Sequence, residues 1–306
     1  MTLAVLTPSY AVDYELCRDL HRSVLEHTGT GVIHHIVVPE RDVEMFSSLA
    51  GARCWIWSER SVLPAHIRYT PRIDRIIRKI GRLPASARVA AINRRRPFPP
   101  IRGWILQQVL KIHMMTELDS DLVLLMDSDV ELVRPVDEET VRRHGRTVLY
   151  RQPAAVTADM SGHVRWHATS CKLLGIPAEP LPLPDYISSF MAWDRQVVAA
   201  LQERITEVAG RPWIDVLAAQ LHLSEWTLYG VFADRVYLGG GTLPWVGTSR
   251  CHEQWGTTPL TESSATEFAR SLEPTDLAMM ISAKTRTPLG LRRRASTEAG
   301  RTVRRG

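Results

Sequence analysis

The sequence has few cysteines, and none of them form a CxxC pair. The four, Cys17, Cys54, Cys171 and Cys251, are far apart and lie among apolar or helical neighbours. A free thiol in such surroundings behaves as a small hydrophobic side chain. The pattern therefore favours free thiols and a reducing, cytoplasmic setting.

Long apolar runs are also missing. No window approaches the roughly eighteen uninterrupted apolar residues that cross a bilayer. The N-terminal segment MTLAVLTPSY lacks both a basic start and a long apolar stretch, so it is predicted to be a strand of the mature fold. With 306 residues, 44% of them hydrophobic, the chain can bury a substantial core.

Acidic residues are scarce in one segment. Between Arg60 and Arg102 there are twelve Lys or Arg but a single acid, Asp74, and the residues after Arg286 repeat the basic bias. Both segments indicate contact with an anion, whether a diphosphate, an acidic acceptor or a membrane surface. The alternative is a solvated face, and for residues 286–306 a disordered basic tail is the preferred prediction.

Alternating apolar runs and helical patterns predict a parallel sheet in the first half. The short runs LAVLTP, GVIHHIVVP and ARCWIWS are separated by helical patterns, the first from about Tyr14 to His27. Such alternation is typical of βαβ units. Another helix is predicted over GWILQQVLKIHMMTEL, where Ile105, Val109 and Ile112 share one face.

The stretch DLVLLMDSDVELVRP, residues 121–135, predicts a central strand and a candidate site. Residues 122–126 are apolar at every position, so the strand must be covered on both faces. Asp127 and Asp129 follow its carboxyl end, where open parallel sheets bind ligands. Two carboxylates this close repel unless a cation lies between them, and Mg²⁺ or Mn²⁺ suits such ligands. The alternative is a turn in which Asp side chains bind backbone amides.

The second half lacks this alternation. It contains the Pro-rich GIPAEPLPLPDY, a strand-like ISSFMAW, a helix that Asp194 can cap, and loops rich in Gly and Trp. Such loops are typical of a pocket rather than an independent domain. One α/β domain is therefore predicted over residues 1–285.

These motifs resemble the GT-A superfamily of nucleotide-sugar glycosyltransferases, in which a DxD motif ends a central strand. The resemblance covers about residues 1–255 and is closest to a bacterial branch with GWxxQQxLK, DSD and SExxLYG motifs. Here these are residues 103–111, 127–129 and 224–230. The resemblance implies a mostly parallel sheet flanked by helices, with residues 1–135 binding the nucleotide sugar and residues 136–285 shaping the acceptor site.

The implied activity is metal-dependent transfer of a sugar, as in hexosyltransferases, to a hydroxyl of a carbohydrate or lipid-linked acceptor. A nucleoside diphosphate sugar, with UDP favoured, would be the donor. Mn²⁺ or Mg²⁺ held by Asp127 and Asp129 would neutralise charge on the departing diphosphate. His252 matches a late His that often completes the metal shell in related enzymes, although a lone His is more often packed or exposed.

Donor binding is predicted to use the loop after the first strand and the helix before DSD. Tyr10 would stack on the base or simply pack, and Ser128 would serve the turn or the ribose. Arg102 and Lys111 would add positive charge at the diphosphate, unless Lys111 is a solvated helix charge. The predicted donor-binding set is Thr7, Ser9, Tyr10, Arg102, Gln108, Lys111 and Ser128.

Glu225 is the predicted acid–base residue, with Asp185 in reserve. A carboxylate can remove the proton of an acceptor hydroxyl, and attack opposite the leaving group would then invert the anomeric centre. The alternative for Glu225 is a carboxylate in the first turn of a helix capped by Ser224. Trp245 or Trp255 would stack on a sugar, or pack structurally.

The segment RIDRIIRKIGRL, residues 72–83, has isoleucines at helical spacing with cations between them. A helix packed on the sheet with its cations outward is preferred, and a peripheral membrane helix is the alternative. The protein is thus predicted to be cytoplasmic, with membrane association left open.

Two other functions remain open. A sugar-phosphate nucleotidyltransferase would share the acidic pair, but TPSY lacks the Gly-rich run that cradles phosphates. A non-catalytic polyanion binder would use the Arg-rich segment. The acidic pair disfavours it because carboxylates repel phosphates without a metal, and no nucleic-acid partner is expected.

Overall fold

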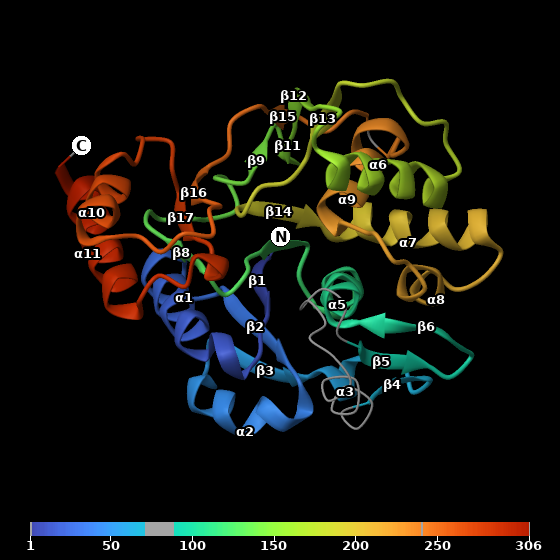
Figure 1. The fold of residues 1–306 in the computed structure, drawn as a ribbon, viewed down its shortest axis with the longest axis horizontal. Coiled ribbons are helices and arrows are strands. Elements are labelled where there is room, and N and C mark those ends of the chain that lie inside the picture. Colours follow the sequence, from blue (N-terminus) through green and yellow to red (C-terminus); the bar gives the residue numbers. More distant parts are fainter. Residues whose placement is uncertain (1, 71–88, 240, 306) are drawn as a thin grey trace.

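The computed structural model of the chain describes residues 2–70, 89–239 and 241–305 (Figure 1). Its centre is a five-stranded sheet with the order β14-β7-β1-β2-β3. Four strands run parallel, and β14 is antiparallel to β7. The predicted α/β fold with a mostly parallel sheet is confirmed. The strands are β1 (Leu3–Pro8), β2 (Ile33–Val38), β3 (Cys54–Ser58), β7 (Leu122–Leu125) and β14 (Met191–Asp194).

The central sheet is covered on both faces, as the apolar strands require. Alternate residues of β1 point to opposite sides: Ala4 and Leu6 join one core, and Leu3 and Val5 join the other. The first core contains α5 (Gly103–Glu117), α7 (Arg195–Ala209), α8 (Trp213–Ala218) and α9 (Glu225–Arg235). The second contains α1 (Tyr14–His27) and a smaller sheet.

That smaller sheet contains the strand that follows the DSD motif directly in the chain. Its order is β16-β17-β8, with β8 antiparallel to β17 and β16 parallel to it. In Figure 1 it lies beside α10 and α11 at one end of the molecule, whereas α6 to α9 lie at the other. These elements are β8 (Val130–Leu132), β16 (Cys251–Gln254), β17 (Ala278–Ile281), α6 (Ser161–Leu174), α10 (Glu262–Arg270) and α11 (Leu289–Arg305).

Short strands and turns complete the fold. A three-stranded antiparallel sheet of β4 (Ile67–Tyr69), β5 (Val89–Asn93) and β6 (Arg96–Arg102) leads into α5. Three two-stranded pairs lie in the second half: β9 (Arg142–Arg143) with β10 (Arg146–Thr147), β11 (Leu149–Tyr150) with β15 (Trp245–Val246), and β12 (Gln152–Val156) with β13 (Leu183–Asp185). The short helices are α2 (Val43–Phe46) and α3 (Glu59–Val62).

The prediction of a disordered tail over residues 286–306 is wrong, because residues 289–305 form α11. Ala295 and Ala299 of this helix are buried against α10 and β17. Arg293 donates at 2.8 Å to both Glu15 and Asp19 of α1. The basic residues therefore anchor the helix to the first half of the chain.

Other predictions have mixed outcomes. All four cysteines are buried free thiols. The helix predicted over residues 72–83 lies outside the described residues. Within the ranges that the structure covers, no helix is long and apolar enough to span a bilayer.

Candidate active site

The loops that follow β1 and β7 meet at the carboxyl edge of the central sheet. Ser128 Oγ donates to Ser9 Oγ at 2.9 Å, and Met126 N donates to the Leu6 carbonyl at 3.2 Å. Because β1 and β7 are parallel neighbours, their ends must lie side by side. The structure therefore brings Ser9 and Ser128 together with the acidic pair.

Lys111 joins two of the predicted site residues. Its ammonium Nζ lies 2.8 Å from Asp127 Oδ1 and 2.8 Å from Glu225 Oε1. The side chains of Lys111 and Glu225 are only 5% and 4% exposed, whereas that of Asp127 is 57% exposed. The ion triad Asp127–Lys111–Glu225 thus runs from the solvent edge of the sheet into the core.

The two carboxylate partners of Lys111 compensate for the burial of its ammonium group. Desolvation alone would lower the pKa of the ammonium, but Asp127 and Glu225 more than offset it, and the pKa lies above its ordinary value. The ammonium also lies 4.7 Å from the centre of the Trp226 ring, a cation–π contact. Lys111 is therefore a fixed positive charge and not a solvated helix residue.

Asp129 lies deeper than Asp127 and is oriented by the main chain. Its Oδ2 accepts a hydrogen bond from Ala283 N, just after β17, at 2.6 Å. Burial and the charge of Asp127 raise the pKa of Asp129, although the Ala283 amide and Arg292 oppose the shift. The turn explanation for this pair holds only in part, because the amide that binds Asp129 comes from a distant segment.

A third carboxyl, Asp13, completes an acidic cluster that sequence analysis missed. Burial, followed by the negative charges of Asp129 and Asp127, raises the pKa of Asp13 to about 6. The only sequence signal was an acid shortly after the loop of β1, and such acids are common.

The acidic pair fits a divalent cation. Asp127 and Asp129 are hard oxygen ligands whose mutual repulsion a cation would relieve. Among residues 2–70, 89–239 and 241–305, no three His, Cys, Asp or Glu side chains are arranged to hold a metal ion. The described residues thus offer two carboxylates, and oxygens of substrate and water would fill the remaining positions.

The predicted three-ligand set that included His252 is not assembled. His252 aligns across β17 with Met279 and Glu131, on the face covered by α10. Its Nε2 lies 3.0 Å from Ser271 Oγ, and its ring packs on Phe268 with ring centres 4.3 Å apart. His252 therefore packs against α10, and among the described residues it forms no three-residue ligand cluster with the acidic pair.

The predicted donor loop divides into buried and exposed parts. Thr7 is 0% exposed, and its Oγ1 lies 2.9 Å from His34 Nε2, so its side chain belongs to the core. Tyr10 is 37% exposed at the edge of the site. Of Thr7 and Tyr10, only Tyr10 is exposed enough to contact a ligand.

One face of α5 leads from the surface to the ion triad. Trp104, Gln108 and Lys111 are spaced i, i+4 and i+7, which places them on the same side of a helix. Gln108 is 1% exposed, and neither of its amide atoms has a partner in the part of the chain that the structure describes. Trp104 packs edge-on against Trp166 of α6, with ring centres 5.5 Å apart.

Arg102, at the N-terminal end of α5, carries similarly unpaired donors. Its Nε and Nη2 are buried, and neither meets an acceptor among the described residues. Buried donors without partners are costly in a finished structure. Together with the Gln108 amide, they indicate groups that a ligand would satisfy.

The SExxLYG motif has a structural explanation as well as a chemical one. Ser224 caps α9 by accepting from Thr227 N at 3.3 Å, which places Glu225 in the first turn. At Gly230, a Cβ atom would lie 2.2 Å from the Tyr186 ring, so only glycine fits. Glu225 thus lies in the first turn of a helix capped by Ser224, as the alternative explanation predicts. The start of this helix holds Glu225 against Lys111.

Two further carboxylates lie toward the acceptor half. Asp185 of β13 accepts from Ile187 N at 3.1 Å, and burial raises its pKa. Glu253 of β16 accepts from Ser189 N at 2.6 Å and from Trp255 Nε1 at 3.0 Å. Burial, followed by the negative charges of Asp185 and Glu253, raises the pKa of the partly buried Tyr150 to about 12.

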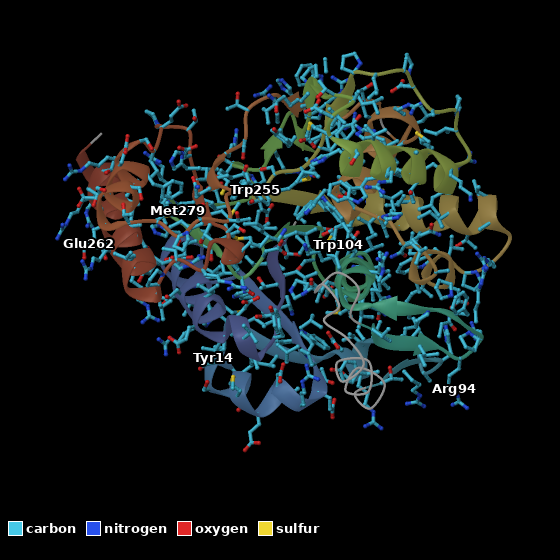
Figure 2. The ribbon with its side chains drawn as sticks, viewed as in Figure 1. Tyr14, Arg94, Trp104, Trp255, Glu262 and Met279 are labelled. Carbon is cyan, nitrogen blue, oxygen red and sulfur yellow. The ribbon has the colours of Figure 1, made fainter. Side chains whose placement is uncertain are left out.

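Glu253 lies near the end of β7 through its hydrogen bond with Ser189. Its partner Ser189 precedes Met191 by two residues, and Met191 pairs with Leu125, the last residue of β7. In Figure 2, Trp104 lies at α5 and Trp255 lies beside β16. Trp255 is 55% exposed and Trp245 is 46% exposed.

Comparison with known proteins gives one family and two solved structures. The family described as "Family of unknown function (DUF6492)" matches residues 2–271. No curated protein matches significantly. A crystal structure of an active-site mutant of LgtC is 11% identical, covers 97% of this chain and 95% of that one, and has a TM-score of 0.46. The galactosyltransferase LgtC in complex with donor and acceptor sugar analogues has the same identity and coverage, and a TM-score of 0.42.

Proposed function

This chain belongs to that family of unknown function (DUF6492), and we propose that it is a glycosyltransferase of GT-A type. It would move a sugar from a nucleoside diphosphate, with UDP favoured, to a hydroxyl of a carbohydrate or lipid-linked acceptor. Mn²⁺ or Mg²⁺ would assist the transfer.

The observation that carries the proposal is the ion triad beside the acidic pair. Asp127 and Asp129 follow a buried strand at the carboxyl edge of the sheet, and a buried ammonium is fixed 2.8 Å from Asp127. Carboxylates for a cation and an adjacent fixed cation are the chemistry that a diphosphate leaving group requires. The metal, when bound, would supply Lewis-acid neutralisation of the departing diphosphate.

The α5 face would bind the donor. Lys111 has three N–H donors, of which Asp127 and Glu225 take two, so one remains for a diphosphate oxygen. The unpaired amide of Gln108, one turn away, would bind sugar hydroxyls. Arg102 would add its unpaired N–H groups, and Tyr10 would stack on the base.

Glu253 is the best-placed carboxylate for the acceptor proton. Glu225, although predicted from sequence, is 4% exposed and bound to Lys111, so its proposed role is to hold that ammonium. Glu253 lies near the end of β7 beside the exposed Trp255, and Asp185 is the second candidate. A base opposite the leaving group would make the reaction inverting.

Thermal shift with UDP-, GDP- and dTDP-sugars, with and without Mn²⁺, tests the proposal. A ligand that binds only the native state raises its melting temperature by mass action. We expect one nucleotide sugar to stabilise the protein in a Mn²⁺-dependent way, and NMR of the product with that donor then gives the anomeric outcome. If no nucleotide sugar shifts the melting temperature, or if Mn²⁺ leaves each shift unchanged, the proposal is wrong.

A further inference from the structure

We propose that Lys111 is an internal counter-ion that competes with the divalent cation for Asp127, and that Glu225 sets the strength of this competition. This inference rests on the proposed function, because it concerns the same acidic pair. It adds a cation-dependent exchange in which Lys111 leaves Asp127 while keeping Glu225.

The first step concerns the carboxylate that both cations would bind. Lys111 Nζ lies 2.8 Å from Asp127 Oδ1, which is direct hydrogen-bond contact. A metal ion binding the same carboxylate would lie within a few ångströms of the ammonium, where like charges repel strongly. Lys111 must therefore weaken its contact with Asp127 when the site is loaded.

The second step concerns where Lys111 goes. Its other partner, Glu225, is 4% exposed and lies at the same 2.8 Å distance. A buried carboxylate without a counter-ion is strongly unfavourable, so this half of the triad persists. The Trp226 ring also holds the ammonium on the α9 side. The displaced Lys111 thus keeps Glu225 and the Trp226 ring as partners, and one of its N–H groups is freed.

The third step predicts that the affinity for the cation changes in opposite directions when either member of the Lys111–Glu225 ion pair loses its charge. Removing the charge of Lys111 removes a competitor, so Asp127 should bind the cation more tightly. Removing the charge of Glu225 leaves the ammonium with Asp127 as its remaining ionic partner, so the cation should bind more weakly. Opposite changes would show that both charges act on the bound cation, and the geometry with Mn²⁺ bound then separates exchange from through-space charge.

The experiment measures Mn²⁺ binding without nucleotide, by electron paramagnetic resonance of free Mn²⁺, in wild type, Lys111→Met and Glu225→Gln. We expect Lys111→Met to lower the Kd about tenfold and Glu225→Gln to raise it about tenfold, as a nearby unit charge requires. Because Lys111→Met strands a buried carboxylate, the double variant Lys111→Met/Glu225→Gln is measured too. It should bind Mn²⁺ more tightly than Glu225→Gln alone.

A crystal structure of wild type with Mn²⁺ gives the direct geometry. We expect the Lys111–Asp127 contact to lengthen beyond hydrogen-bond distance while Lys111–Glu225 stays intact. Through-space charge alone would shift the two Kd values but leave the Lys111–Asp127 contact in place, and that result would overturn the exchange.

The remaining outcomes separate the two ideas. If wild type binds Mn²⁺ but both single variants shift in the same direction, or neither shifts, the competition is wrong and the proposed function stands. If neither wild type nor any variant binds Mn²⁺, the metal part of the proposed function fails together with this inference.

Discussion

Three carboxylates near the site, two glutamates and one aspartate, differ in what they contact, and those contacts distinguish their proposed roles. Glu225 is buried against an ammonium, Asp185 receives one main-chain amide, and Glu253 receives a main-chain amide and the indole of Trp255. Only the last two are free of an ion pair with Lys111, so they remain the candidates for the proposed acceptor base. At the scale of single residues, position therefore outweighs the motif in which a carboxylate occurs.

Glu253→Gln should lower kcat by about 10²–10⁴-fold, because the amide keeps the shape of the side chain but cannot take up a proton. The KM for the donor should change little, since the donor contacts lie on α5. Steady-state kinetics with the donor found by thermal shift measures both values. The exposed Glu267→Gln serves as a matched control. Near-wild-type kcat in Glu253→Gln, with a large loss in Asp185→Asn, would transfer the role to Asp185.

At the scale of elements, local signals predicted the structure well where they were strong. The bounds of α1 and the caps of α7 and α9 match the structure because periodicity and N-cap chemistry act over a few residues. The last helix, α11, was missed because its buried stripe contains alanines, which a count of apolar residues barely registers. One of its arginines, Arg293, which was counted as part of a solvated tail, forms ion pairs with Glu15 and Asp19 of α1.

The site shows the same division. The sequence motifs contain the residues of the ion triad, since each motif lies at the end of a predictable element. By contrast, Asp13 and Glu253 reach the site through the packing of distant segments, and the partners of His252, Ser271 and Phe268, also come from a distant segment. Pairing over such sequence separations leaves no local signal.

Ala299→Asp tests whether α11 is part of the folded core. Ala299 is 0% exposed, so the substitution buries an unpaired carboxylate and should destabilise the protein by about 3 kcal/mol. Urea denaturation followed by circular dichroism measures the change. Thr297→Asp, at an exposed position of the same helix, should stay within about 0.5 kcal/mol of wild type. Equal effects of the two substitutions would mean that α11 does not pack as described.

At the scale of the whole molecule, the two halves share one sheet. β14 comes from the second half, yet it pairs along its full length with β7, the strand that precedes the acidic pair. The two halves are therefore connected through the continuous hydrogen bonds of one sheet rather than through a linker.

The pH dependence of stability is also a property of the whole fold, with opposing contributions. Burial lowers the pKa of His35 to about 4, and it lowers the pKa values of His34 and His21. Burial raises the pKa of Asp13 to about 6 and that of Glu59 to about 7. Neutral histidines favour the fold above their unfolded pKa and lose this contribution as pH falls, whereas the two acids act in the opposite direction.

His35→Gln isolates one of these contributions. Wild-type His35 accepts a hydrogen bond from Trp57 Nε1 at 3.1 Å, which requires an unprotonated Nδ1. Between about pH 7.5 and about pH 5, protonation of the unfolded state should cost wild type about 2 kcal/mol through this residue. The variant lacks that loss, so its free energy of unfolding by urea should fall less over the same range. Parallel curves for the two proteins would contradict the assignment.

The hydrogen bond from Ala283 N to Asp129 also bears on the order in which the chain is made. A ribosome releases the DSD motif long before it reaches residue 283, and chains begin to fold from their N-terminal part. During that interval the second aspartate lacks the amide that orients it. The orientation of Asp129 is thus completed by a segment near the end of the chain, so an early-terminated chain would carry the motif without this hydrogen bond.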